Sequence, residues 1–89
     1  MSQFRLTKGE FLYLYGYDRP LGEFFLTKLD RETKEPEFAI SSHASTCEHP
    51  DYPGQLDFTN GEILEILNAE LGDDAPENFT LALTLDEPI

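Results

Sequence analysis

The sequence predicts an α+β domain: a mostly antiparallel sheet with one helix packed on one face, in the element order β-β-β-α-β. Three observations lead to this fold class. Two aromatic-rich segments flank a short turn, a segment of helical periodicity follows a capping motif, and a strictly alternating segment comes last. A chain of 89 residues corresponds to one domain, which we expect to span residues 1–89.

The first two predicted strands form a hairpin. Residues 10–17 are rich in aromatic side chains, and their alternation places three tyrosines on one face and leucines on the other. The next five residues include Pro20 and Gly22, which favour a turn. Residues 23–29 form the second strand, and the short link between the strands predicts antiparallel pairing.

A third, shorter strand is predicted over residues 37–41, where the two large apolar side chains share one face. Phe4 and Leu6 have the spacing of an extra strand before the hairpin, but we expect the Lys8–Gly9 pair to interrupt it. Residues 42–57 are the longest irregular stretch and contain three turn-forming residues. Long loops of this kind often carry function.

The helix is predicted from about Asn60 to Leu71. Thr59 and Glu62 match a capping box at its start, and Gly72 suits the position just past its end. Its apolar side chains form one arc that can lie on the sheet. The arc consists of Ile63, Leu64, Ile66, Leu67 and Leu71.

The last predicted strand covers residues 79–85, after an acidic connection over residues 73–78. Large apolar residues alternate here with small or half-polar ones, which is the pattern of a strand with one exposed face. The apolar face consists of Phe79, Leu81, Leu83 and Leu85.

Charge is distributed very unevenly along the chain. No lysine or arginine follows Lys34, whereas the remaining 55 residues carry 13 acidic ones, so the negative charge of this part slightly exceeds the net charge of −12 of the whole chain. Such a charge repels nucleic acids and anionic membranes and attracts basic protein surfaces. The chain also has a single cysteine and no apolar run long enough to span a bilayer, which predicts a cytoplasmic protein.

The predicted function is therefore that of a small acidic interaction or inhibitor module that binds a basic protein. That partner could normally bind nucleic acid, with the module's carboxylates taking the places of phosphates. Carboxylates at the C-terminal end of the predicted helix oppose its macrodipole, and no basic residue lies nearby in the sequence to offset them. We thus assign them to binding. The acidic candidates are Glu62, Glu65, Glu70, Asp73, Asp74 and Glu77.

Tyr13, Tyr15 and Tyr17 are the predicted aromatic anchors, because tyrosine is enriched in protein interfaces. An equally good interpretation places this row in the core. A strand with apolar residues on both faces needs a cover on each, and a loop, a second copy or another protein could supply the second one.

Two alternative functions stay open. One is a structural or accessory domain that forms a homodimer and whose acidity serves solubility. The other is a metal- or thiol-dependent role of residues 43–51, where His43, Cys47 and His49 are of the types that bind zinc. Their spacing matches no established zinc motif, and acidic surroundings disfavour a reactive thiolate. The sequence therefore predicts no catalytic residue, resident metal or cofactor.

Overall fold

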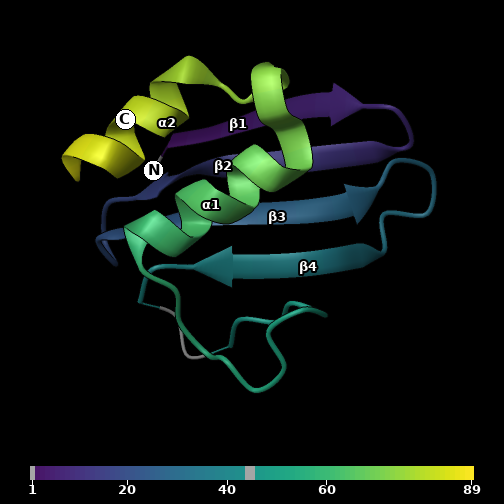
Figure 1. Cartoon of the computed structure of the whole chain (residues 1–89), viewed down its shortest axis with the longest axis horizontal. Helices are drawn as coiled ribbons and strands as arrows, with labels where there is room; N and C mark the ends of the chain where they lie inside the picture. Colours follow the sequence, from purple (N-terminus) through teal and green to yellow (C-terminus); the bar gives the residue numbers. More distant parts are fainter. Residues whose placement is uncertain (1, 44–45) are drawn as a thin grey trace.

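The computed structural model describes residues 2–43 and 46–89, which form a sheet layer and a helical layer (Figure 1). The strands are β1 (Ser2–Lys8), β2 (Phe11–Asp18), β3 (Glu23–Asp30) and β4 (Pro36–Ser41). They are followed by α1 (Asn60–Leu71), the short 3₁₀ helix η1 (Gly72–Asp74) and α2 (Glu77–Leu85). The predicted α+β class and the antiparallel sheet are confirmed, but the element order is β-β-β-β-α-α.

The sheet is a meander in which each strand pairs antiparallel with the next, in the order β1-β2-β3-β4. Lys8 pairs with Phe11, so only Gly9 and Glu10 form the turn between β1 and β2. Gly9 has a φ of 62°, a conformation that glycine adopts at little cost in such a turn. The extra strand suggested by Phe4 and Leu6 is present as β1. Lys8 and Gly9 do not interrupt this strand, because Lys8 is its last residue and Gly9 begins the turn.

The predicted strand over residues 79–85 is also wrong, since these residues belong to α2. Helical spacing buries Phe79, Ala82 and Leu83, whereas Leu81 and Leu85 are 51% and 59% exposed. Leucine and alanine are strong helix formers, and a short apolar run fits both periodicities. Two helices, not one, therefore cover the sheet.

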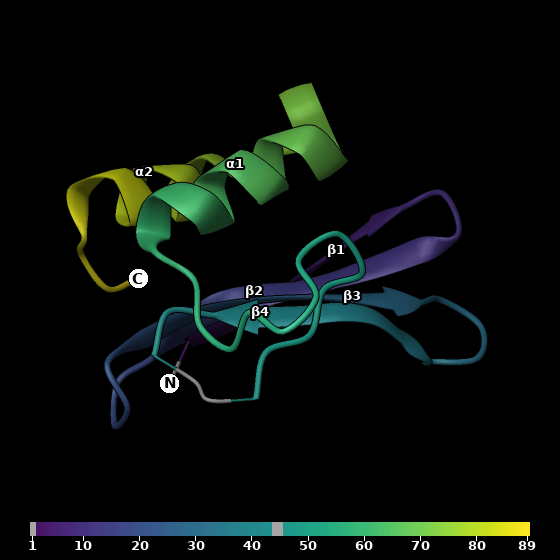
Figure 2. The same ribbon diagram turned by 60° about the horizontal axis from the view of Figure 1, so that its bottom comes forward.

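Both helices lie on the same side of the sheet (Figure 2). The core forms between them and the sheet face that points toward them. The sheet contributes Tyr13, Tyr15, Phe24, Leu26, Phe38 and Ile40. The helices contribute Ile63, Ile66, Leu67, Leu71, Phe79, Ala82 and Leu83.

The predicted helix over Asn60–Leu71 is confirmed as α1, together with its capping box. Thr59 Oγ1 accepts a hydrogen bond from the Glu62 N–H, and Glu62 Oε1 accepts one from the Thr59 N–H. Among the residues that the structure describes, no helix has both the length and the apolar character that a membrane span requires.

The long loop before α1 runs along the free edge of β4. Ala39 and Glu48 exchange two backbone hydrogen bonds of 2.9 Å, so a single bridge extends the sheet beyond β4. His49 stacks on Phe38 with ring centroids 4.5 Å apart, and Tyr52 packs edge-on against His49. These contacts hold much of the predicted irregular segment against the sheet.

Candidate functional site

Glu62, the first acidic candidate, supports the fold. Its carboxylate accepts hydrogen bonds from the Thr59 N–H and from Gln55 Nε2, both at 3.0 Å. These hydrogen bonds hold the pKa of Glu62 below its usual value. The carboxylate thus caps α1 and ties it to the preceding loop.

Glu70 turns toward the sheet. Its Oε1 lies 2.7 Å from Lys28 Nζ of β3 and accepts a hydrogen bond of 3.3 Å from the Tyr13 hydroxyl. The side chains of Lys28 and Glu70 are only 17% and 25% exposed. Lys28 Nζ also lies 4.1 Å from the centre of the Phe11 ring, a cation–π contact.

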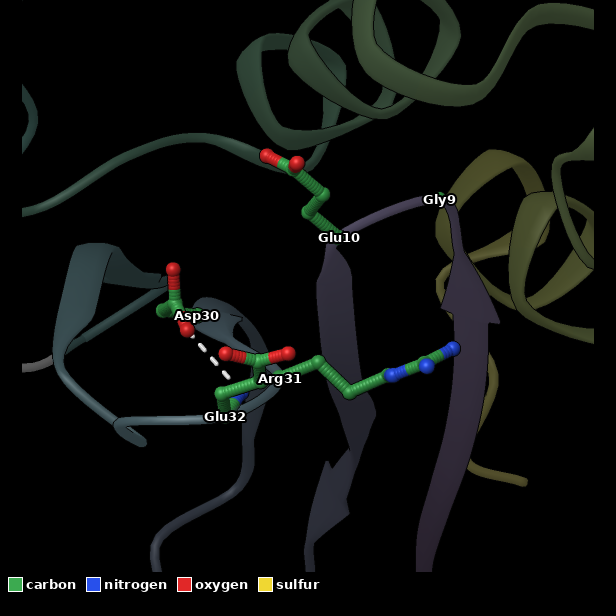
Figure 3. Close-up of a pocket in the computed structure, with 5 residues that line it drawn as sticks. All are labelled: Gly9, Glu10, Asp30, Arg31 and Glu32. Carbon is green, nitrogen blue, oxygen red and sulfur yellow. Dashed lines mark hydrogen bonds between the residues drawn. The ribbon is translucent and has the colours of Figure 1, made fainter.

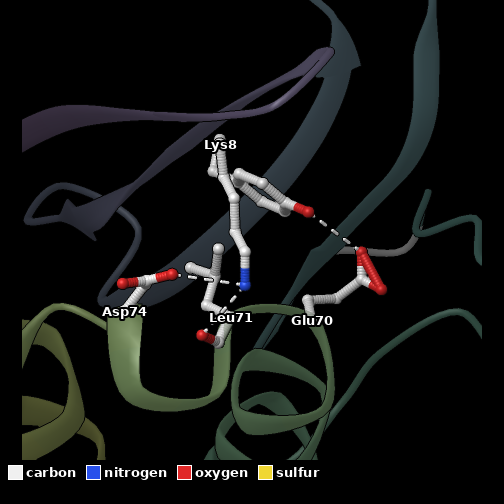
Figure 4. Close-up of polar contacts among 5 residues, drawn as sticks. Lys8, Glu70, Leu71 and Asp74 are labelled. Atoms are coloured by element: carbon white, nitrogen blue, oxygen red, sulfur yellow. Dashed lines mark hydrogen bonds and ion pairs between the residues drawn. The ribbon is translucent and has the colours of Figure 1, made fainter.

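Lys8 makes the second sheet-to-helix contact (Figure 4). Its Nζ donates a hydrogen bond of 3.3 Å to the Leu71 carbonyl at the end of α1, and it forms an ion pair of 3.3 Å with Asp74. A cation here offsets the negative end of the helix dipole. We call Lys8, Tyr13, Lys28, Glu70 and Asp74 the polar clamp.

The polar clamp corrects one part of the sequence analysis. No basic residue lies near these carboxylates in the sequence, but Lys28 and Lys8 offset Glu70 and Asp74 from the sheet. Two of the six acidic candidates, Glu70 and Asp74, therefore contribute to folding. The relevant lysines are far away in the sequence and adjacent only in the folded chain.

The tyrosine row faces the helices. Tyr13 and Tyr15 are buried, and Tyr17 is half-buried with its ring centroid 4.8 Å from that of Phe24. This arrangement agrees with the interpretation that places the tyrosine row in the core. Burial raises the pKa of Tyr15, and burial together with Glu70 raises the pKa of Tyr13 to about 12. Neither Tyr13 nor Tyr15 is accessible to a partner as an anchor.

This environment of Tyr13 predicts alkaline destabilisation. The unfolded chain ionises near the ordinary pKa of 10.0, whereas the folded chain holds the proton up to about pH 12. Stability from this group is therefore fully present below pH 10.0 and is lost as the pH rises toward 12. Urea unfolding across this range should show a steeper decline for the wild type than for Tyr13→Phe. An equal decline in both proteins would contradict the assignment.

The loop candidates do not converge. Cys47 is buried and its Sγ accepts a hydrogen bond of 3.1 Å from the Ser41 N–H. His49 packs on Phe38, and its Nδ1 accepts a hydrogen bond of 3.1 Å from the Asp51 N–H. His43 is exposed. Within residues 2–43 and 46–89, no group of three or more histidine, cysteine or acidic side chains is arranged to hold a metal ion.

A hollow of about 200 Å³ lies where the turn after β1 meets the loop after β3 (Figure 3). Asp30 Oδ1 accepts hydrogen bonds from the Glu32 and Thr33 N–H groups, and these lower the pKa of Asp30. The Arg31 N–H donates to the Glu10 carbonyl at 2.8 Å, and the Arg31 side chain extends across β2 toward β1. The polar groups of Asp30 and Arg31 therefore stabilise the turn after β1 and the loop after β3.

The remaining acidic candidates are exposed but do not form one surface. Glu65 lines a hollow beside Asp51 in the loop, whereas Asp73 lies in η1 and Glu77 is the first residue of α2. None of these three candidates has an ion-pair partner among the described residues. The six candidates are thus divided between the capping box, the polar clamp, the loop side of α1, η1 and the start of α2.

The sequence analysis also missed the exposed side of α2. The exposed side chains of Leu81 and Leu85 lie one helical turn apart and follow Glu77 at the same spacing. The sequence analysis placed both leucines on the buried face of a strand and therefore did not predict that they are exposed. We define the α2 surface as Glu77, Leu81 and Leu85, together with Glu87 just past the end of the helix, all of them exposed. The i, i+4 spacing of the first three residues was the signal that could have found it.

No family model matches this chain, and neither the curated proteins nor the solved structures include a significant match to it.

Proposed function

We propose that this chain is a small acidic interaction module that binds a basic surface of a larger protein through the α2 surface. The observation that carries the proposal is the pair of exposed leucines, Leu81 and Leu85, with acidic residues on both sides of them along the chain. Protein interfaces combine an apolar centre with a polar rim. Here the acidic rim would attract a basic partner, and Leu81 and Leu85 would pack against the surface of that partner.

The end of α2 supports a role other than folding for the carboxylate of Glu87. Asp86 and Glu87 follow the last turn of the helix, where the macrodipole disfavours negative charge, and no basic residue lies in that turn. The polar clamp offsets the corresponding end of α1. Asp86 Oδ1 accepts a hydrogen bond of 2.8 Å from Asn60 Nδ2 and so links the end of α2 to the start of α1, whereas Glu87 forms no ion pair among the described residues. The Glu87 carboxylate is therefore available to a basic partner.

The net charge of −12 selects the class of partner. It favours a basic protein over a nucleic acid or an anionic membrane, because both of these would be repelled. A protein that normally binds nucleic-acid phosphates has the required basic surface. In that case the module would compete with nucleic acid, which is how an acidic inhibitor acts.

The test is a quantitative pull-down from cell lysate with three tagged proteins: the wild type, a Leu85→Ala, Glu87→Lys variant and a Glu32→Lys control. Glu32 lies in the exposed loop after β3, away from α2. We expect basic proteins on the wild type and on the control, eluted by high salt or by added double-stranded DNA. The α2 variant should lose at least about tenfold of this capture, the equivalent of ~1.4 kcal/mol.

Stability separates lost binding from lost folding. Glu87→Lys replaces an anion with a cation near the C-terminal end of α2, which should leave the helix as stable as before or more so. Equal capture by the α2 variant and the Glu32→Lys control would contradict the proposal. Capture of predominantly acidic proteins by the wild type would contradict it as well.

A further inference from the structure

The two edges of the sheet differ in how their outward backbone groups are satisfied. β1 forms one edge and β4 the other (Figure 1). At the β4 edge, the N–H and C=O of Ala39 are both bonded to Glu48 at 2.9 Å. The Ser41 N–H donates to Cys47 Sγ, and the Ser41 C=O accepts from the Phe58 N–H, both at 3.1 Å. The loop after β4 therefore covers this edge as an additional strand would.

The outward backbone groups of β1 belong to every second residue of the strand. Lys8 and Phe11 close the two-residue turn as a hydrogen-bonded pair, and along an antiparallel ladder such pairs alternate with pairs that are not bonded to each other. Gln3, Arg5 and Thr7 therefore direct their N–H and C=O groups away from β2. Within residues 2–43 and 46–89, these groups have no hydrogen-bond partner. The β1 edge thus lacks the cover that the β4 edge has.

The edge of β1 is also regular and accessible. All seven residues of the strand pair with β2 without a register shift, and the strand contains no proline. Prolines, bulges and covering loops are common protections against the addition of another strand at a sheet edge, and β1 has none of these among the described residues. The exposed residues are Gln3, Phe4, Arg5, Thr7 and Lys8. An extended segment can therefore approach the outward groups of β1.

The side chains of β1 indicate what an added strand would carry. On the side of the helices, Phe4 is 38% exposed although its ring stacks on Tyr15 with centroids 5.5 Å apart, so an apolar neighbour would cover the rest of the ring. Arg5 points to the other face, where its cross-strand neighbour is Leu14. Arg5 forms no ion pair within the part of the chain that the structure describes, and β1 has no carboxylate. An acidic residue opposite Arg5 would complement this charge.

We propose that the edge of β1 is a strand-addition site for an extended segment of another protein. The segment pairs antiparallel with β1 and carries an acidic residue opposite Arg5, between apolar residues opposite Phe4 and Leu6. A second copy of this chain fits less well, because the register that uses all three outward residues places two Arg5 side chains directly opposite each other. The net charge of −12 on each copy adds to that repulsion. The proposal does not rest on the α2 surface.

The first test is an NMR titration of the ¹⁵N-labelled full chain with the peptide acetyl-Thr-Val-Glu-Val-Thr-amide, at about 0.15 M salt, where the Debye length is about 8 Å. We expect the largest amide shifts at Gln3, Arg5 and Thr7, whose N–H groups gain acceptors. Methylation of the backbone nitrogen of the central glutamate removes a donor aimed at β1 and should weaken binding at least about tenfold. Methylation of the second valine nitrogen, which points away from β1, is the matched control and should leave binding unchanged.

The second test is a charge exchange between the chain and the peptide. The wild type should prefer the glutamate peptide over one with a central lysine by at least about threefold, and Arg5→Glu should reverse this preference. Lys34→Glu makes the same change of charge in the exposed loop after β3 and should keep the wild-type preference.

Three outcomes would overturn the proposal. One is the absence of shifts at Gln3, Arg5 and Thr7 at millimolar peptide, and another is an equal effect of the two methylations. The third is a shift of the same amides with protein concentration alone, which would assign the edge to a second copy. Far-UV circular dichroism of Arg5→Glu and Lys34→Glu reports whether each variant is folded.

Discussion

Replacement of Phe79 with alanine is expected to lower the free energy of unfolding by about 3–5 kcal/mol, the usual range for loss of a buried aromatic ring. Phe79 is fully buried between the helices and the sheet. Its ring centroid lies 4.9 Å from that of Tyr15 and 6.4 Å from that of Phe24. The substitution would open a cavity beneath α2 and remove both aromatic contacts. Urea unfolding followed by circular dichroism measures the effect.

Leu81→Ala is the matched control for this prediction. Leu81 is 51% exposed, and alanine is a better helix former, so the change should lie within about 0.5 kcal/mol of zero. In a strand over residues 79–85 both side chains would share the buried face and both substitutions would be costly. A large effect at position 81 would therefore contradict the helical assignment of this segment.

Replacement of Glu70 with alanine is expected to cost about 2–3 kcal/mol. It would leave the mostly buried ammonium of Lys28 and the hydroxyl of Tyr13 without their acceptor. An additional Lys28→Met change should recover part of the loss, because the cation is then removed together with its partner. The measurement is again urea unfolding, with coupling taken from the double-mutant cycle.

Asp74→Ala provides the comparison for Glu70. Its ion pair with Lys8 has the same sheet-to-helix geometry, but the Asp74 side chain is 64% exposed. Exposed pairs contribute only about 0–1 kcal/mol, and their contribution falls with salt. If Glu70→Ala cost no more than Asp74→Ala, the burial of the Lys28–Glu70 pair would have no energetic consequence.

The parts of the fold that the sequence predicted depend on local chemistry. The hairpin between β2 and β3 follows from alternation on both sides of a turn that contains Pro20 and Gly22. The helix over Asn60–Leu71 follows from its capping box and from Gly72, which has a φ of 54°. Each of these signals operates within a few residues, and the packing of distant parts of the chain agrees with it.

Residues 79–85 show why α2 was not predicted. Alternation over seven residues is typical of a strand, but Phe79, Ala82 and Leu83 also fit the i, i+3, i+4 pattern of a helix. Only packing decides between the two. Four strands already complete the sheet, and the helical solution buries Phe79 while leaving Leu81 in solvent.

The distribution of the acidic candidates required the tertiary structure. Lys28 shares a strand face with Phe24 and Leu26, and a cation on an apolar face signals a buried partner. The sequence does not show that this partner is Glu70. For the same reason, proximity of the six carboxylates in the sequence did not predict that Glu62, Glu70 and Asp74 would have partners within the chain.

The arrangement of the polar clamp also bears on how long a native molecule survives. Each strand pairs with the one before it, so the sheet closes only short loops, whereas the hydrogen bond between Tyr13 and Glu70 in the polar clamp joins residues 57 positions apart. Short-range pairing is kinetically favoured, because the entropy lost on loop closure rises with separation. We therefore expect the hairpins in the folding transition state and the clamp only after it. Loss of Glu70 would then accelerate unfolding and leave the folding rate nearly unchanged, so the clamp sets the lifetime of the native state.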